Sequence, residues 1–443
     1  MTDAEGMMWR LEQDPFLTSN IALVAILDRR PDVEVLRRKL ERATYLIPRL
    51  RHRVHTSPGN LTPPTFELDP NFELDAHIRH VALPAPGRRR QLYDMAALLA
   101  MDPLPANRPL WQVVVVEGLK KGRAAVIVKA HHTITDGEGG IELALHLVDV
   151  ERHAPPPEVP DPDTVAEAEA RAAASPSDTL QDLLAGTMRI PLGVTQQVRE
   201  LLADPSRIPE ARASASESLR SLVGELTDTA PARSPLWTDR SLGRRFLVGR
   251  APLESTRAVA KALGGTLNTA FVTVAAEAAG RYHAEMGAPT DSLRASMAVS
   301  TRTAGSGANA FSLVRLVAPT ADMPIAERFH AVQTAVEEAV EQSESGALEA
   351  VAALSVLLPT SVIARLARQQ TQTIDFATSN VRGAPVPVYV AGAELIENYP
   401  MGPTIGTAFN LTLLSYQDSL DMGLNVDRGA VADPDLLGRS LRR

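Results

Sequence analysis

Two adjacent histidines, His131 and His132, are followed by Asp136 and Gly137 in the segment VKAHHTITDGEGG, residues 128–140. A neutral imidazole can take a proton from a hydroxyl group and return it to a leaving group, because its pKa lies near neutral pH. Adjacent side chains at the end of a strand point in opposite directions, so one ring is expected to face a substrate and the other the scaffold. The spacing therefore favours a proton-transfer site.

A metal site and a chance arrangement are the two alternatives. A metal site needs at least three converging ligands, and the remaining histidines show no HExxH or comparable spacing. The pattern HHxxxDG would arise by chance in a chain of this composition with odds on the order of one in a thousand. Asp136 follows a turn and is expected to be structural, either pairing with a distant arginine or fixing the loop. Gly137 can bring its backbone N–H close to a ligand.

The histidine pair is expected at the end of a β-hairpin. WQVVVVEGL (111–119) and RAAVIVKAHH (123–132) are rich in β-branched residues and are separated by a short polar segment. In IELALHLVDVERH (141–153), Ile141, Leu145 and Val148 then recur at helical spacing. The motif is therefore predicted to lie on a strand-to-helix turn.

The flanking segments predict a mixed α/β protein in two parts. A strand at 20–28 is followed by a helix whose inner face carries Val33, Leu36, Leu40, Ala43 and Ile47. Residues 1–153 form the first predicted domain, and residues 154–235 form a linker rich in proline and alanine.

Residues 236–443 form the second predicted α/β domain. It contains LESTRAVAKALGG, a helix ended by a glycine pair, and two strands, SMAVSTR and SLVRLVAP. Two further helices are predicted. The inner face of the first is expected to consist of Leu267, Phe271, Val274, Ala278 and Tyr282, and the second carries Phe329, Val332, Val336 and Val340.

The composition restricts the class of protein. The chain has 443 residues, no cysteine and a formal net charge of −8. Nucleic acid is excluded as a main partner, because phosphate backbones are bound mainly through Lys and Arg. A thiol nucleophile, a disulfide and cysteine-bound zinc are excluded as well. The acidic N-terminus and short apolar runs predict a cytoplasmic protein, with attachment to a membrane surface left open.

Several motifs together resemble one family. HHTITDG matches the HHxxxDG signature of CoA-dependent acyltransferases and condensation domains. RPLWQVVVVEGL, KALGGTLNTAFVTVAAEAAGRY, SNVRGAPVPVYVAGAEL and the tail from NYPMGPTIGTAFN onward resemble bacterial wax ester synthase/diacylglycerol acyltransferases, in the order of that family. The resemblance covers nearly the whole chain outside the proline-rich linker.

The resemblance implies two chloramphenicol-acetyltransferase-like α/β domains with a tunnel at their interface. The implied reaction moves a long-chain acyl group from acyl-CoA to diacylglycerol or a fatty alcohol, without an acyl-enzyme and without a cofactor beyond acyl-CoA as co-substrate. His132 is the implied general base, supported by His131 and Gly137. Asp136 is expected to form an ionic contact with Arg302. The implied location is the cytoplasm, with the inner membrane face or lipid droplets as attachment surfaces.

Other site residues follow from the same resemblance. Gly137 N–H and Asn268 are both candidates for stabilising the oxyanion, and Asn268 has the alternative role of a helix N-cap. Pro109, Leu110 and Trp111 are expected to enter the strand and the core, with a lining role in the acyl pocket as the alternative.

The chain departs from the family at residue 269. Its Asn-Asp pair reads Asn268-Thr269 here, which puts the usual contacts at that helix start in doubt. An acyltransferase for another acceptor alcohol and a catalytically silent lipid- or acyl-CoA-binding protein are therefore kept as alternatives. Two arginine-rich patches, 49–53 and 87–90, are expected to be solvated surface, with CoA phosphates or anionic headgroups as alternative ligands. No sequence feature indicates an oligomeric state.

Overall fold

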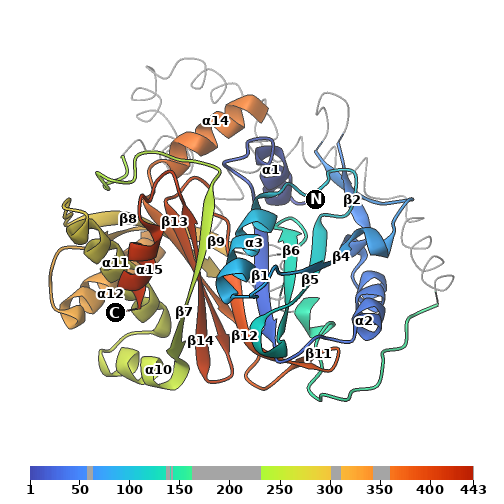
Figure 1. Cartoon of the computed structure of the whole chain (residues 1–443). Helices are drawn as coiled ribbons and strands as arrows, with labels where there is room; N and C mark the ends of the chain where they lie inside the picture. Colours follow the sequence, from blue (N-terminus) through green and yellow to red (C-terminus); the bar gives the residue numbers. More distant parts are fainter. Residues whose placement is uncertain are drawn as a thin grey trace.

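The computed structural model is shown in Figure 1, and the residues that it describes are 1–56, 63–135, 140, 143–161, 231–300, 311–342 and 360–442. The predicted site residues Asp136, Gly137 and Arg302 lie outside these ranges, as does most of the predicted linker. The structure therefore places the histidine pair, Asn268 and the segment 109–111.

One mixed sheet of six strands carries the histidine pair, with the strand order β11-β12-β1-β6-β5-β4. Its strands are β1 (Asn20–Leu27), β4 (Ile78–Ala82), β5 (Trp111–Glu117), β6 (Ala124–His131), β11 (Tyr389–Val390) and β12 (Ala393–Met401). The predicted hairpin is confirmed, because β5 and β6 pair antiparallel. His131 is the last residue of β6, where it pairs with Asn20 of β1.

Helices cover both faces of this sheet, because successive side chains of a strand point to opposite faces and both sets are apolar. Val126, Val128 and Ala130 pack into the core on the side of α2 (Val33–Leu46), whereas Ala125 and Ile127 pack on the side of α3 (Arg89–Met101). The predicted inner face of α2 is confirmed at Leu36, Leu40 and Ala43, all of which are buried. Helix α1 (Asp3–Leu11) and a two-stranded sheet, β2 (His52–His55) with β3 (Thr65–Leu68), lie beside this half.

The second six-stranded sheet has the order β7-β14-β13-β10-β8-β9. Its strands are β7 (Arg244–Pro252), β8 (Ser292–Ser300), β9 (Phe311–Pro319), β10 (Phe376–Arg382), β13 (Phe409–Tyr416) and β14 (Ser419–Asp427). The helices of this half are α10 (Leu253–Ala262), α11 (Leu267–Glu285), α12 (Ile325–Gln342), α14 (Thr360–Thr371) and α15 (Pro434–Leu441). The glycine pair after α10 ends the helix as expected, with Gly264 at φ +78°.

The two halves are joined because two strands from late in the sequence belong to the first sheet. Although β11 and β12 lie late in the sequence, they belong to the first sheet, where β12 pairs antiparallel with β1. β12 and β14 come so close that a Cβ on Gly423 would lie 1.7 Å from the carbonyl oxygen of Pro400. Helix α3 lies between the halves and contacts β7 as well as β1 (Figure 1).

The predicted inward position of Val274 is wrong, and two other apolar residues of predicted helices, Leu145 and Val340, are exposed. Leu145 is 62% exposed because the described helical turn ends there, which breaks the periodicity expected over 141–153. Val274 is 37% exposed, since α11 instead buries its alanine-rich face. Val340 is 42% exposed near the end of α12, whereas Phe329 and Val332 of the same helix are buried.

Among the described helices, none is by itself long and apolar enough to cross a membrane, and α10 with α11 meets the length and composition only as a pair bent by 95°.

Candidate active site

His131 is buried, and both of its ring nitrogens are engaged. Nδ1 lies 2.8 Å from Thr133 Oγ1 and accepts the backbone N–H of Thr133 at 3.2 Å. Nε2 lies 3.1 Å from Glu12 Oε2, and the ring of Trp9 stands edge-on at 6.1 Å between centroids. Because Nδ1 is an acceptor, a neutral ring carries its hydrogen on Nε2 and donates it to the carboxylate. His131 is therefore fixed in one orientation.

Glu12 joins His131 to the chain segment that enters β1. Its Oε1 accepts the hydroxyl of Thr18 at 2.6 Å, and its Oε2 accepts the N–H of Ser19 at 2.9 Å. Burial raises the pKa of Glu12, but the hydrogen bond and charge of His131, with the bonds from Thr18 and Ser19, outweigh it and leave this pKa below its ordinary value. Glu12 is a site residue that the motif search missed, because it lies 119 positions from its partner.

His132 is the first residue after β6 and is only partly buried. Its backbone N–H donates to the carbonyl oxygen of Ser19 at 3.0 Å. The N–H of Ile134 donates to the backbone carbonyl oxygen of His131 at 2.9 Å. The main chain of the pair is thus held on both sides, by the segment before β1 and by the turn after β6. The two rings differ as expected for neighbours at a strand end, since only His131 is fully buried.

Arg49 supports the turn after the histidine pair. Its Nη1 donates to the carbonyl oxygen of Thr133 at 2.8 Å and pairs with Glu5 at 2.6 Å. Glu5 is fully buried, and the guanidinium lies 4.8 Å from the ring centroid of Phe66. Arg49 is therefore engaged within the fold, contrary to the solvated surface expected for the patch at 49–53.

The second arginine patch is also engaged. Arg89 in α3 pairs with Glu397 of β12, and the hydroxyl of Tyr399 donates to the same carboxylate at 2.7 Å. Arg90 pairs with Asp94 at 2.8 Å. Arg88 and Arg89 nevertheless stay exposed, as expected for solvated surface.

Pro109, Leu110 and Trp111 lie buried beside the histidine strand. The carbonyl oxygen of Leu110 accepts the N–H of His131 at 2.9 Å. The ring of Trp111 stacks on His77 at 4.4 Å between centroids, and its Nε1–H donates to the carbonyl oxygen of Leu50 at 2.8 Å. In the described structure this segment holds the strand that carries His131.

Asn268 is the second residue of α11 and not its N-cap, contrary to one of its expected roles. The N-cap is Thr266, whose Oγ1 accepts the N–H of Thr269 at 3.1 Å. The hydroxyls of these two threonines lie 2.9 Å apart. Thr269 thus provides contacts at the helix start where the family has aspartate. The side-chain amide of Asn268 contacts Met297 Sδ at 2.9 Å.

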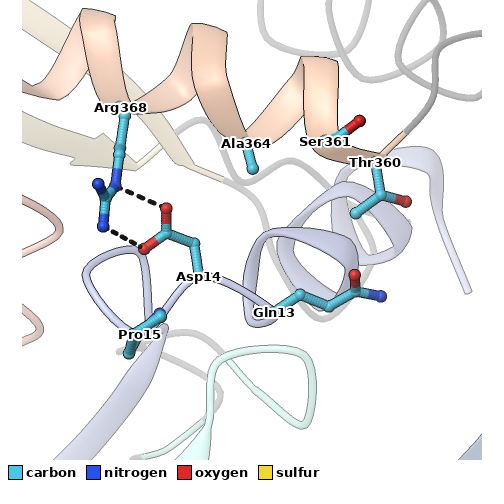
Figure 2. Close-up of a pocket in the computed structure, with 7 residues that line it drawn as sticks. All are labelled: Gln13, Asp14, Pro15, Thr360, Ser361, Ala364 and Arg368. Atoms are coloured by element: carbon cyan, nitrogen blue, oxygen red, sulfur yellow. Dashed lines mark hydrogen bonds and ion pairs between the residues drawn. The ribbon is translucent and has the colours of Figure 1, made fainter.

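A pocket of about 370 Å³ opens between the loop after α1 and the start of α14. Figure 2 shows the residues that line it, which are Gln13, Asp14, Pro15, Thr360, Ser361, Ala364 and Arg368. Arg368 Nε lies 2.6 Å from Asp14 Oδ2, so this ion pair joins the two walls. The first wall directly follows Glu12 in the chain, whereas the predicted site residues within the described ranges do not line the pocket.

Within the described ranges, no group of three or more His, Asp or Glu residues has the geometry to hold a metal ion. The site described above consists of a fixed imidazole, a neighbouring imidazole that is partly exposed, and a half-buried carboxylate. Such an arrangement can orient a general base and transfer a proton.

Family models match both halves of the chain. The wax ester synthase/diacylglycerol acyltransferase catalytic domain matches residues 1–271, and the WS/DGAT C-terminal domain matches residues 307–443. A putative diacylglycerol O-acyltransferase of Mycobacterium tuberculosis is 29% identical over 447 residues, covering 98% of this chain and 89% of that protein. Another from the same species is 31% identical over 420 residues, covering 91% and 86%.

Solved structures share the fold. The wax ester synthase/diacylglycerol acyltransferase of Marinobacter aquaeolei VT8 matches with a TM-score of 0.63 and 23% identity, over 96% of this chain and 93% of that chain. The first condensation domain of the calcium-dependent antibiotic synthetase, in complex with a substrate analogue, matches with a TM-score of 0.58 and 18% identity, over 100% and 95%. The expected two-part α/β fold is confirmed, and the tunnel stays a prediction.

Proposed function

Because this chain belongs to the wax ester synthase/diacylglycerol acyltransferase family and is an acyltransferase, we propose that it moves a long-chain acyl group from acyl-CoA to diacylglycerol or a fatty alcohol. His132 is the general base of this proposal. The products are triacylglycerol or a wax ester, together with free CoA.

The proposed reaction needs one base and no acyl-enzyme. His132 takes the proton of the acceptor hydroxyl as its oxygen attacks the thioester carbonyl, and the resulting oxyanion collapses with loss of the CoA thiolate. The imidazolium then protonates that thiolate, which restores the neutral base. Every proton is accounted for by one imidazole, and the reaction requires no cofactor.

The different environments of the two histidines are the observation that carries the assignment. His131 is 1% exposed, and its ring nitrogens are engaged by Thr133 and Glu12. A ring held in this way can orient its neighbour but is poorly placed to meet an alcohol. His132 follows it on a fixed main chain and is partly exposed, which suits a base that must reach a substrate.

The contacts of Thr269 support turnover over a silent binding role. Replacement of the family's aspartate was the only sequence feature that favoured a silent protein. Thr269 nevertheless makes the contacts with Thr266 that begin α11, so the substitution leaves that helix start intact. The curated relatives named as diacylglycerol O-acyltransferases point in the same direction.

The test is product formation by purified protein supplied with palmitoyl-CoA, diacylglycerol and hexadecanol. His132→Ala is expected to slow transfer by roughly 10²–10⁴-fold, the usual contribution of a positioned general base. His80→Ala, which removes an exposed histidine of β4, is the matched control and should retain activity. Full transfer by His132→Ala would remove the proposed base. Preference for a non-lipid alcohol would favour the alternative acceptor.

A further inference from the structure

Helix α14 of the second half lies against α1, the first helix of the chain (Figure 1). Two contacts join it to the segment that leads from α1 into β1. Near the beginning of α14, Thr360 Oγ1 accepts the Nε–H of Arg10 at 3.1 Å. About two turns later, Arg368 Nε lies 2.6 Å from Asp14 Oδ2, and its Nη2 donates to Asp14 Oδ1 at 3.0 Å (Figure 2). Helix α14 is therefore attached to the first half near both of its ends.

Arg368 contacts more than the carboxylate of Asp14. Its guanidinium also lies 4.4 Å from the ring centroid of Phe16. The planar guanidinium can meet two carboxylate oxygens and stack on an aromatic ring at the same time, which an ammonium cannot do. One side chain of the second half thus holds two residues of the loop at 12–19, called the entry loop below because it leads into β1.

The entry loop is braced by its own hydrogen bonds. Asp14 Oδ1 accepts the N–H of Phe16 at 3.0 Å, and the carbonyl oxygen of Asp14 accepts the N–H of Leu17 at 2.9 Å. Leu17 is buried. The two ends of the loop are tied together, because Glu12 Oε2 accepts the N–H of Ser19 at 2.9 Å. A displacement of Asp14 is therefore passed to the ends of the loop.

The ends of the entry loop contact the histidine pair. Glu12 Oε2 accepts the Nε2–H of His131 at 3.1 Å, and the carbonyl oxygen of Ser19 accepts the N–H of His132 at 3.0 Å. The loop therefore has α14 on one side and the histidine pair on the other. Each step from Arg368 to His132 is a direct contact or a hydrogen bond within this short loop.

We propose that Arg368 is a positioning residue for acyl transfer. By contacting Asp14 and Phe16 it keeps the entry loop in place, and through this loop it keeps the ring of His131 and the main chain of His132 in the reactive arrangement. The inference rests on the proposed function, since it adds a residue to the same site. It also gives the second half a part in the chemistry of a motif that lies in the first half.

A purely structural ion pair leads to a different expectation. Exposed ion pairs contribute little to stability, and the side chain of Arg368 is 43% exposed. Loss of its charge should therefore leave the Tm nearly unchanged under either interpretation. A contact that only attaches α14 would leave kcat unchanged as well, whereas a positioning contact would lower it.

The first test compares Arg368→Met with Arg365→Met, which removes an exposed arginine from the same helix. Arg368→Met should lower kcat by roughly two- to thirtyfold, the usual range for a residue that acts on a site through its neighbours. The KM for palmitoyl-CoA and the Tm should stay nearly unchanged. Arg365→Met should leave all three unchanged. Arg368→Lys, which keeps the charge but loses the two-pronged contact, should fold and lose part of the activity.

A double-mutant cycle checks that the effect passes through Asp14. Asp14→Asn keeps an oxygen for the N–H of Phe16 but loses the charge that Arg368 contacts. Because both changes interrupt the same contact, the double variant should lose no more kcat than the more damaging single variant.

The ring of His131 provides a second readout, which does not depend on turnover. Its tautomer, with the hydrogen on Nε2 and an acceptor at Nδ1, is visible by NMR in protein that carries isotopically labelled histidine. The His131 signals are assigned by their loss in His131→Asn. Arg368→Met should shift or broaden them, whereas Arg365→Met should leave them in place.

Three results would each overturn the inference: an unchanged kcat in Arg368→Met and Arg368→Lys, additive losses in the double variant, or unaltered His131 signals in Arg368→Met. Absence of any acyl-transfer product from the wild-type protein would instead overturn the proposed function. The NMR comparison would still report whether Arg368 positions His131, so the two failures are distinguishable.

Discussion

Glu12 Oε2 lies 3.1 Å from His131 Nε2, although the two residues are 119 positions apart in the chain. This contact ties the loop after the first helix to the end of β6. It also fixes the tautomer of His131, because Nδ1 already accepts the N–H of Thr133. The motif at 131–137 is thus completed by a residue far outside it.

Replacement of Glu12 by Gln should lower activity more than stability. The single oxygen of an amide can replace only one of the two carboxylate oxygens that accept Thr18 and Ser19, and the charge that orients His131 is lost, so kcat should fall roughly ten- to a hundredfold. Glu34→Gln, at an exposed position of α2, is the control. Initial rates with palmitoyl-CoA and diacylglycerol give the comparison, and equal rates for the two variants would contradict the prediction.

Acid should weaken the protein in part through Glu12. Its folded pKa lies below the ordinary value near 4.5, so its stabilising contribution is fully present above about pH 4.5 and is lost as the pH falls through the lower folded pKa. Urea unfolding at pH 7 and at successively lower pH should therefore show a steeper decline for the wild type than for Glu12→Gln. Parallel declines would show that Glu12 does not contribute.

Trp111→Phe should test whether this residue belongs to the core or to an acyl pocket. The change leaves the carbonyl oxygen of Leu50 without its donor and should cost about 1–3 kcal/mol in unfolding free energy. The preference among acyl-CoA chain lengths should stay the same, because the ring packs on His77 inside the fold. A changed chain-length preference would assign Trp111 to the pocket instead.

Thr269→Val should separate helix stability from catalysis. It keeps the side-chain shape but removes the hydroxyl that lies 2.9 Å from that of Thr266, at an expected cost of about 0.5–1.5 kcal/mol. Turnover should be unaffected, since this contact serves the start of α11. A large fall in kcat with little change in unfolding free energy would instead give Thr269 a part in the reaction.

His283 should make the second half sensitive to mild acid. Its Nε2 lies 2.7 Å from Ser234 Oγ, its Nδ1 is 2.8 Å from the carbonyl oxygen of Ala279, and burial lowers its pKa. The unfolded chain binds a proton near pH 6.5, where the folded protein does not, so stability should fall as the pH drops below about 6.5. His283→Gln should reduce the difference in Tm between pH 7.5 and pH 5.5, whereas the exposed control His80→Gln should not.

Helices and strands were predicted well where the pattern of apolar residues within one segment is sufficient to define them. The β5–β6 hairpin and the buried face of α2 follow from alternation and from helical spacing. Val274 was misplaced because alanines, which carry little hydrophobic signal, form the packed side of α11. The place of β12 in the first sheet could not be predicted, because no local pattern specifies that β12 pairs with β1.

The centre of the candidate site was predictable from the sequence, whereas its supports were not. The HHxxxDG pattern indicated His131 and His132, and the role of His132 as a base stays a prediction. Glu12 and Arg49 carry no motif of their own, and their roles depend on contacts made by distant segments. The arginine patch containing Arg49 looked like solvated surface because sequence shows charge but not the buried Glu5 that pairs with it.

The position of β12 has a consequence for biosynthesis. Because β1 lies between β6 and β12, its outer edge has no partner until residue 401 has been synthesised and released from the ribosome. During most of translation the nascent first half therefore exposes an unpaired strand edge, which is a template for aggregation. If the chain were divided near residue 236, one fragment would contain β1 without β12 and the other would contain β12 without β1. Co-expression of both fragments should therefore recover soluble protein that neither fragment gives alone.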